Sequence, residues 1–324
     1  MNNNFTIIGT NEVIWNMIDL VGYLSKNQHK HISLVINPEA ICLETLGIYK
    51  LLEHFNFEQV DIYTENCLEK HSKYNIIKLV TLFDFRTSWL KQKWNIDAEY
   101  HSWNQKKVFL AFYHRPTASR LGLASHLYCT HPAVSLVHFS SFVNCTETIY
   151  HFELDKLLSY DIQSAKNATS MIPDMPIWSN GKEDLTLIKK FIVDENVDTI
   201  SKTIYQDILI DVVSENHSLG NTFYITEKTV RPMWLKKPFI VFASCHHLVY
   251  LRQIGFKTFS DFWSEEYDRY EGRDRYIRIL NLIDEIAKKS VSELERMYRD
   301  MQYILDYNYN LLHNQTFQTT ITAI

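Results

Sequence analysis

The chain has 324 residues, of which 46% are hydrophobic and 22% charged, and its formal net charge is −5. This is the composition of ordinary globular protein, and the length suits two domains of about 150 residues. No run of about 18 uncharged apolar residues occurs, so no membrane span is predicted. No signal peptide is expected, and the five widely spaced cysteines fit a reducing, cytoplasmic compartment.

The first hundred residues alternate between strand and helix signals. Strands are predicted at Phe5–Gly9, His31–Ile36 and Val60–Tyr63, and helices at Glu12–Leu24 and Ala40–Phe55. Residues 76–85 are typical of a strand followed by a loop. This alternation predicts a doubly wound parallel sheet, so we expect residues 1–104 to form a Rossmann-like domain.

A basic and aromatic run follows, made of Arg86, Trp89, Lys91, Lys93 and Trp94. Such a mixture can stack on sugars or bases. A half-buried helix with snorkelling lysines is the more common structure for this composition. Both interpretations stay open at this point.

A second alternating set begins after Lys107. Its strands are predicted at Val108–Phe112, Ser135–Phe139 and Ile208–Val213, and its helices around Ser119–Tyr128 and Leu185–Val193. We expect residues 105–275 to form a second Rossmann-like domain. The helical residues of 276–324 would either return to the first domain or cap the second. Because no Gly-x-Gly-x-x-Gly fingerprint occurs, a nicotinamide or flavin site is disfavoured.

The most informative segment runs from Asp211 to Phe242. The buried strand at its start should end in a crevice, since open α/β sheets bind ligands at the carboxyl ends of their strands. Thr226 is a plausible N-cap for a helix from Glu227 to about Lys236, whose free N–H groups would favour a phosphate. The polar residues predicted near this crevice are Glu215, Asn216, Tyr224, Thr226, Glu227, Lys228 and Arg231.

These residue types suit a nucleotide sugar. Lys228 and Arg231 are three residues apart and could neutralise a diphosphate, while Glu215 or Glu227 could accept from sugar hydroxyls. Each residue also has an ordinary structural explanation, because Thr-Glu-Lys is a common helix start and Glu227 with Arg231 is a common surface ion pair. Their association within about thirty residues favours the functional interpretation.

The segment resembles the donor-binding motif of the alpha-1,3-fucosyltransferase family, in which a Glu-Asn-Ser-type turn precedes Tyr-Ile-Thr-Glu-Lys, a helix and a Pro-Val strand. The matching residues are Glu215, Asn216, Ser218, Tyr224, Ile225, Thr226, Glu227, Lys228 and Pro238. The chain is also similar to phage and other viral proteins that carry Thr-Glu-Lys-Thr and, later, the segments found here at Gly255–Phe259 and Glu265–Asp268. A weaker match lies upstream, where a strand, a polar loop and a helix would bring Arg115 and Arg120 to the diphosphate.

The resemblance implies a GT-B glycosyltransferase, in which two Rossmann-like domains face a cleft and the C-terminal domain holds the nucleotide. It assigns contact with the nucleotide sugar to Glu215, Tyr224 and Lys228. No Asp-x-Asp occurs, so we expect a GDP- or UDP-linked sugar to bind without metal, through Lys and Arg, and no other cofactor. No Cys-x-x-Cys or compact His/Cys cluster occurs, so a structural metal is not expected.

An inverting transfer needs a carboxylate base near the acceptor hydroxyl, and the first domain would supply it. Glu39, Glu65 and Asp84 end or follow predicted strands, and nothing ranks them. The acceptor would be a glycan or a hydroxylated or hydroxymethylated base in phage DNA, in the host cytoplasm if the protein is viral. The negative net charge mildly disfavours DNA, while basic groups such as Lys236-Lys237 leave it open. The alternative is a catalytically inactive carbohydrate-binding or virion-associated protein with the same fold.

Overall fold

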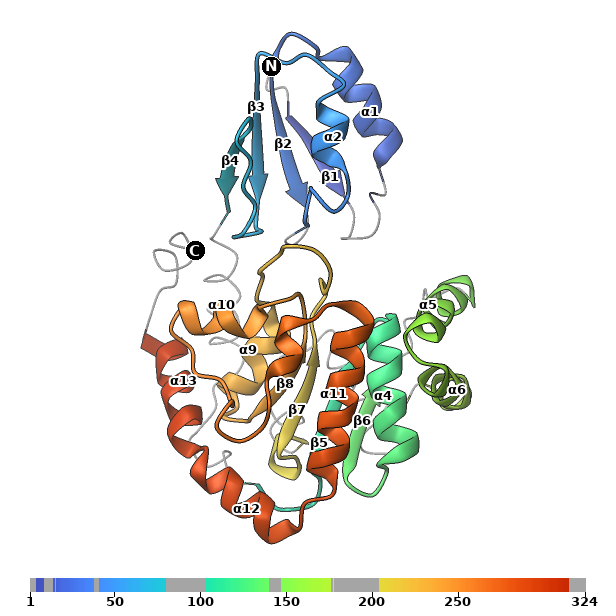
Figure 1. Cartoon of the computed structure of the whole chain (residues 1–324), viewed down its shortest axis with the longest axis vertical. Helices are drawn as coiled ribbons and strands as arrows, with labels where there is room; N and C mark the ends of the chain where they lie inside the picture. Colours follow the sequence, from blue (N-terminus) through green and yellow to red (C-terminus); the bar gives the residue numbers. More distant parts are fainter. Residues whose placement is uncertain are drawn as a thin grey trace, which may run out of the picture.

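The structure is a computed structural model that describes residues 4–8, 14, 16–37, 41–79, 103–139, 147–175, 177 and 204–314. It is an α/β protein with two four-stranded parallel sheets, each flanked by helices. Figure 1 shows the first sheet with its helices set apart from a larger second domain. Among the residues described, no helix is both long and apolar enough to cross a lipid bilayer.

The first sheet contains four parallel strands that pair in sequence order. They are β1 (Asn4–Ile8), β2 (His31–Asn37), β3 (Gln59–Thr64) and β4 (Asn75–Lys78), and the helices are α1 (Met17–Lys26) and α2 (Ile48–Leu52). The predicted strands are confirmed. The helix predicted from Ala40 is much shorter, because turns precede it and Gly47 has a left-handed φ of 70°.

The order of the first sheet differs from the expected doubly wound pattern. Its described strands follow one another without a reversal. Right-handed crossovers therefore place α1 and α2 on the same face, as Figure 1 shows. The described part of this sheet contains no topological switch point.

The second sheet does contain such a reversal. Its strands are β5 (Phe109–Tyr113), β6 (Ser135–Phe139), β7 (Ile210–Ser214) and β8 (Phe239–Phe242), in the spatial order β6-β5-β7-β8 and all parallel. From β5 the chain runs through α4 (Ala118–Thr130) to β6, and from β7 through α9 (Glu227–Trp234) to β8 on the other side. The two crossovers diverge, so a crevice is expected at the carboxyl ends of β5 and β7.

The remaining helices of the second domain are α5 (Glu147–Tyr160), α6 (Ile162–Met171), α10 (His247–Gln253), α11 (Gly272–Ala287), α12 (Val291–Asp300) and α13 (Gln302–Asn314). Two 3-10 segments lie at Ile172–Asp174 and Glu266–Arg269. The helix expected at Leu185–Val193 lies outside the described residues.

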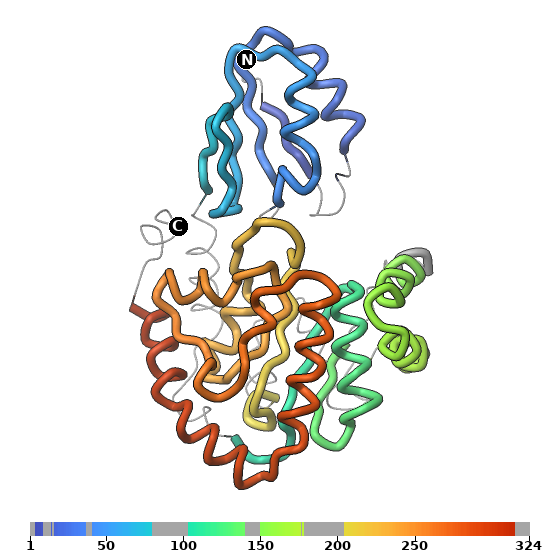
Figure 2. Tube along the Cα trace, viewed as in Figure 1, coloured from blue at the N-terminus to red at the C-terminus, as the bar shows by residue number. Residues whose placement is uncertain are grey.

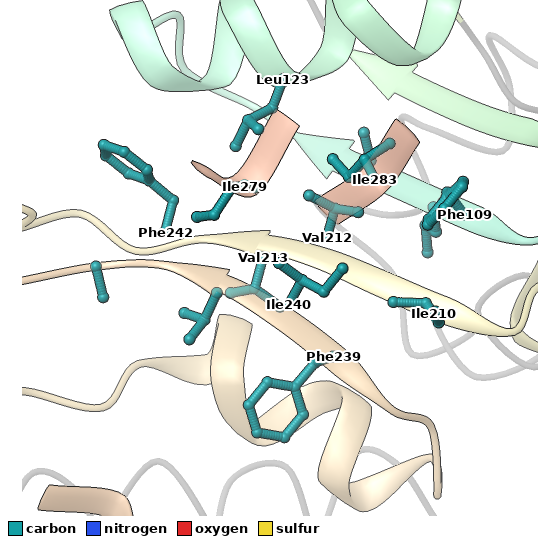
Figure 3. Packing of buried hydrophobic residues seen from close by; sticks show 14 of the residues in the cluster. Phe109, Leu123, Ile210, Val212, Val213, Phe239, Ile240, Phe242, Ile279 and Ile283 are labelled. Carbon is teal, nitrogen blue, oxygen red and sulfur yellow. The ribbon is translucent and has the colours of Figure 1, made fainter. Parts of the chain in front are cut away.

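Helices α11 to α13 pack on the second domain. Their buried apolar residues belong to the same core cluster as β5 to β8. Figure 3 shows Leu123 of α4 and Ile279 and Ile283 of α11 on one side of the strands, with Phe239 of β8 on the other. Figure 2 shows the red part of the trace following the second domain, which is the capping arrangement that the sequence had left open.

Candidate functional site

Each crossover helix at the switch point begins with a threonine cap. The Thr117 side chain accepts from the Arg120 backbone N–H at 3.3 Å, and Thr226 accepts from the Lys228 N–H at 3.1 Å. The predicted N-cap at Thr226 and the start of α9 at Glu227 are therefore confirmed. The helix ends at Trp234, slightly before the predicted end.

Arg120 joins the ends of β5 and β7. Its Nη2 donates to the Ser214 carbonyl at 3.1 Å and to Asn216 Oδ1 at 2.7 Å, and its Nη1 lies 3.5 Å from the Arg115 carbonyl. The side chain is buried, with 3% of Arg120 exposed. The upstream match and the main motif, about 95 residues apart in the chain, thus meet at one point of the fold.

Four basic side chains gather around this point, and we call them the basic cluster: His114, Arg115, Arg120 and Lys228. Burial, and then the positive charges of Arg120, Arg115 and Lys228, lower the pKa of His114. Each of these three cations is therefore near enough to act on the His114 imidazole. The Lys228 Nζ also lies 2.7 Å from Glu227 Oε1. An anionic ligand bound at this point would face mainly positive charge.

Glu215 holds the start of α9 against the end of β7. Its carboxylate is buried and accepts from the Thr226 N–H at 3.3 Å, the Thr226 hydroxyl at 2.5 Å and the Thr229 hydroxyl at 2.5 Å. This carboxylate takes the place that the sequence analysis gave to a phosphate at the helix N-terminus. Glu215 therefore has a structural role, which is to hold the start of α9 in place.

The N-terminus of α4 also holds a carboxylate. The Ala118 N–H donates to Glu153 Oε2 at 2.7 Å, and Glu153 comes from α5. Both helix N-termini at the switch point are thus already compensated by protein anions. An added anion would be bound by the side chains of the basic cluster rather than by the N–H groups expected from the sequence.

Arg231 is directed away from the basic cluster. Its Nη2 lies 3.0 Å from Asp211 Oδ2, its Nε donates to Tyr205 Oη, and its guanidinium stacks over Phe112 at 5.0 Å. Asp211 is completely buried in β7. Arg231 is therefore paired inside the domain, whereas the sequence had placed it with Lys228 on one diphosphate. Glu227 pairs with Lys228 rather than with Arg231.

The loop between β7 and α9 carries the remaining motif residues and contacts the first domain. Asn216 is exposed and Tyr224 is half-buried. Asn66, just after β3, donates from Nδ2 to the Asn221 carbonyl at 2.9 Å and accepts the Phe223 N–H at 3.2 Å. This loop is the segment that reaches toward the first sheet in Figure 1. The two domains therefore meet next to the motif.

A pocket of about 290 Å³ lies at this domain contact, lined by Cys42, Glu44, Leu68, Glu69, Asn221 and Tyr250 among others. Glu69 is buried, and its carboxylate accepts from the Tyr49 hydroxyl at 2.6 Å and from Asn66 Nδ2 at 3.1 Å. Burial raises the pKa of Glu69. The pocket is thus lined by a carboxylate, that of Glu69, which binds a proton more readily than an exposed glutamate does.

Of the three carboxylates predicted as a base, one lies in the described part of the chain. Glu65 follows β3 directly and is buried. Glu39 and Asp84 lie outside the described residues, as does the run from Arg86 to Trp94. His114, Asn66 and Glu69 were not predicted from the sequence as residues of the site. Of these, only His114 had a local signal, since it stands at the end of a predicted strand beside two arginines.

The two later segments that resemble viral proteins brace each other. Glu265 accepts from the Thr258 hydroxyl at 2.8 Å and from the Phe259 N–H at 2.7 Å. Asp268 accepts from the Leu248 N–H at 3.1 Å and pairs with the buried Arg275 at 3.0 Å. These contacts give both segments a structural role within the second domain.

Lys236 and Lys237 do not form a basic surface for DNA. Lys237 is completely buried and lies over the Tyr298 ring at 5.3 Å. Lys236 pairs with Asp306 at 2.8 Å. This basic group of the sequence analysis is therefore occupied within the second domain.

The fold and the site together define a two-domain α/β protein with a cluster of basic side chains at the switch point of its second sheet. Comparison with known protein families, with curated proteins and with solved structures found no match.

Proposed function

We propose that the chain is a metal-independent glycosyltransferase of GT-B organisation that takes its sugar from a GDP- or UDP-linked donor. The observation that carries this proposal is the convergence of His114, Arg115, Arg120 and Lys228 at the switch point between β5 and β7. Open α/β sheets bind nucleotides at this position. A cluster of fixed cations there suits a diphosphate.

The basic cluster would act on the leaving group. Cleavage of the bond between the anomeric carbon and oxygen leaves negative charge on the departing diphosphate, and nearby fixed cations stabilise that charge. Lys228 and Arg115 are assigned this contact because Arg115 is exposed and Lys228 partly exposed, so a ligand can reach both side chains. Asn216 and Tyr224, on the loop after β7, are assigned contacts with the sugar or the nucleoside.

The other motif residues support this site without contacting the donor. Glu215 fixes Thr226 and Thr229, so it sets where α9 and Lys228 begin. Arg231 fastens the same helix to Asp211 in β7. Arg120 has both roles, because it is part of the basic cluster and its guanidinium also links Ser214 to Asn216.

The acceptor would enter from the first domain, through the pocket at the domain contact. Glu69 is a buried carboxylate of that domain that lines this pocket, and burial shifts its pKa in the direction that suits a general base. The lining contains the carboxylates of Glu44 and Glu69 and the single cation of Lys70, so the pocket does not suit a polyanion such as DNA. A hydroxyl of a glycan is therefore the proposed acceptor.

A donor screen on the purified full chain tests the proposal. Release of GDP or UDP from nucleotide sugars is measured with and without glycan acceptors and with hydroxymethylated DNA, all in the presence of chelator. Lys228→Ala should reduce turnover by about 100-fold, since removing one electrostatic contact to a developing charge commonly has this effect. Lys166→Ala, on an exposed position of α6, is the matched control and should behave like the wild type.

Three outcomes would contradict parts of the proposal. Nucleotide binding without turnover of any donor would support the inactive, carbohydrate-binding alternative. Wild-type turnover by Lys228→Ala would remove the basic cluster from the mechanism. Transfer to DNA and not to glycans would overturn the proposed acceptor.

A further inference from the structure

A second group of chemically active side chains lies far from the switch point, where α4 ends. His126 is in the last part of α4, His131 is the residue that caps its C-terminus, and Asp284 comes from α11. His126 and His131 follow Arg120 by 6 and 11 residues in the chain, so about 9 Å and about 16 Å of helix separate them from it, given a rise of about 1.5 Å per residue. This group therefore belongs to a different place on the domain.

The three side chains converge on one point. His126 Nε2 lies 2.7 Å and His131 Nε2 lies 2.6 Å from the same oxygen of Asp284. One ligand atom from each residue falls within 4.8 Å of the other two. The imidazole rings meet edge to face, with centroids 5.2 Å apart. Each imidazole can donate its Nε2–H to this oxygen, so two hydrogen bonds to one carboxylate hold the three side chains together without a metal.

Two imidazoles and a carboxylate are ligands that zinc and related divalent transition metals bind well. The Asp284 charge offsets half of the charge of the ion, and the two histidines bind as neutral imidazoles. The site is enclosed on one side, because the His126 and His131 side chains are 10% and 17% exposed. Asp284 is 36% exposed, so water can complete the coordination.

The distances allow a metal after a small adjustment. Zinc bonds of about 2.0–2.1 Å at tetrahedral angles separate two ligand atoms by about 3.3 Å. The nitrogen–oxygen distances of 2.6 and 2.7 Å would therefore increase by roughly 0.6 Å. Side-chain rotation supplies such a movement, and Asp284 is on the partly exposed side of the group.

We propose that His126, His131 and Asp284 bind one divalent transition-metal ion, with Zn²⁺ as the expected ion. The ion would fasten the C-terminal end of α4 to α11. This site is independent of the proposed transferase, and it differs from the sequence expectation of no structural metal. That expectation rested on local spacing, whereas His126 and Asp284 are 158 residues apart.

The test uses the full chain after treatment with chelator, followed by removal of the chelator. Zinc binding is measured by titration calorimetry, and the melting temperature is measured with and without zinc. The wild type should bind one zinc per chain and melt at a higher temperature with zinc. His131→Gln and Asp284→Asn should each weaken binding at least about tenfold, because each removes one of three protein ligands.

His151→Gln is the matched control, since His151 is an exposed histidine on α5 outside this group. It should bind zinc as the wild type does. The proposal is overturned if the wild type binds no stoichiometric zinc, or if both variants bind it as tightly as the control. Circular dichroism checks that the variants are folded. If His131→Gln does not fold, zinc binding by Asp284→Asn alone tests the proposal, because Asp284 is the most exposed of the three residues and its substitution should disturb the fold least.

Discussion

The buried Lys237 should lower the free energy of unfolding at neutral pH. Replacing it with methionine should change how this free energy depends on pH. The side chain is completely buried between α9 and β8. Burial lowers the pKa of Lys237 from 10.5 to about 7, although Asp207 acts in the opposite direction. The folded protein therefore resists the protonation that the unfolded chain accepts readily.

The sign and size of the effect follow from this difference. Below about pH 7 Lys237 is protonated in both the folded and the unfolded state, so the full destabilisation from burying its charge is present. The two pKa values set an upper bound of about 5 kcal/mol on this destabilisation. Between about pH 7 and 10.5 the unfolded state alone binds the proton, so stability rises with pH by up to about 1.4 kcal/mol per unit. Lys237→Met removes this contribution.

Urea unfolding at several values between about pH 6 and 10 measures the effect. Lys237→Met should increase the free energy of unfolding at pH 7. The free energy of unfolding of this variant should also rise less steeply with pH than that of the wild type. Lys166→Met, at an exposed position of α6, should keep the wild-type slope. Equal slopes in the wild type and Lys237→Met would refute the reasoning, because the lysine would then titrate alike in both states.

Three further substitutions test the packing and the domain contact. Gly122→Ala would place its Cβ 2.3 Å from Tyr276 Oη, so it should lower the free energy of unfolding by about 1–3 kcal/mol in urea, and an unchanged value would show that Tyr276 moves freely. Ser290→Ala removes the side-chain bond of the α12 capping box, in which the Ser290 hydroxyl accepts from the Glu293 N–H, and should cost about 1 kcal/mol by the same assay; no loss would mean that this bond does not stabilise the helix start. Gly220→Ala should cost at least about 1 kcal/mol, since φ is +77° and the Cβ would lie 2.4 Å from Thr45 Oγ1. A wild-type melting temperature would contradict that expectation.

The elements around the site were predictable because their signals are local. The buried strand before Glu215, the cap at Thr226 and the helix start after it depend on neighbouring residues, and the structure confirms them. The order of the strands depends on long-range pairing. Periodicity alone could therefore not show that the first sheet lacks a switch point among its described strands.

The roles of individual charged residues were harder to predict. Glu215 and Arg231 are residue types that bind sugars and phosphates, yet each has found an internal partner, at Thr226 and Asp211 respectively. Which partner a charge takes depends on three-dimensional distance. The same applies to Asn66, whose partner Asn221 is 155 residues away in the chain.

The most direct test of the central claim is a calorimetric titration of the full chain with GDP and with UDP in the presence of chelator. The account predicts that one of the two nucleotides binds to the wild type and to Lys166→Ala with equal affinity. Lys228→Ala should bind it at least about tenfold more weakly, because a charged contact to the diphosphate is worth about 1.5–3 kcal/mol. Absence of binding by both nucleotides, or equal affinity in Lys228→Ala and the wild type, would contradict a diphosphate site at the basic cluster.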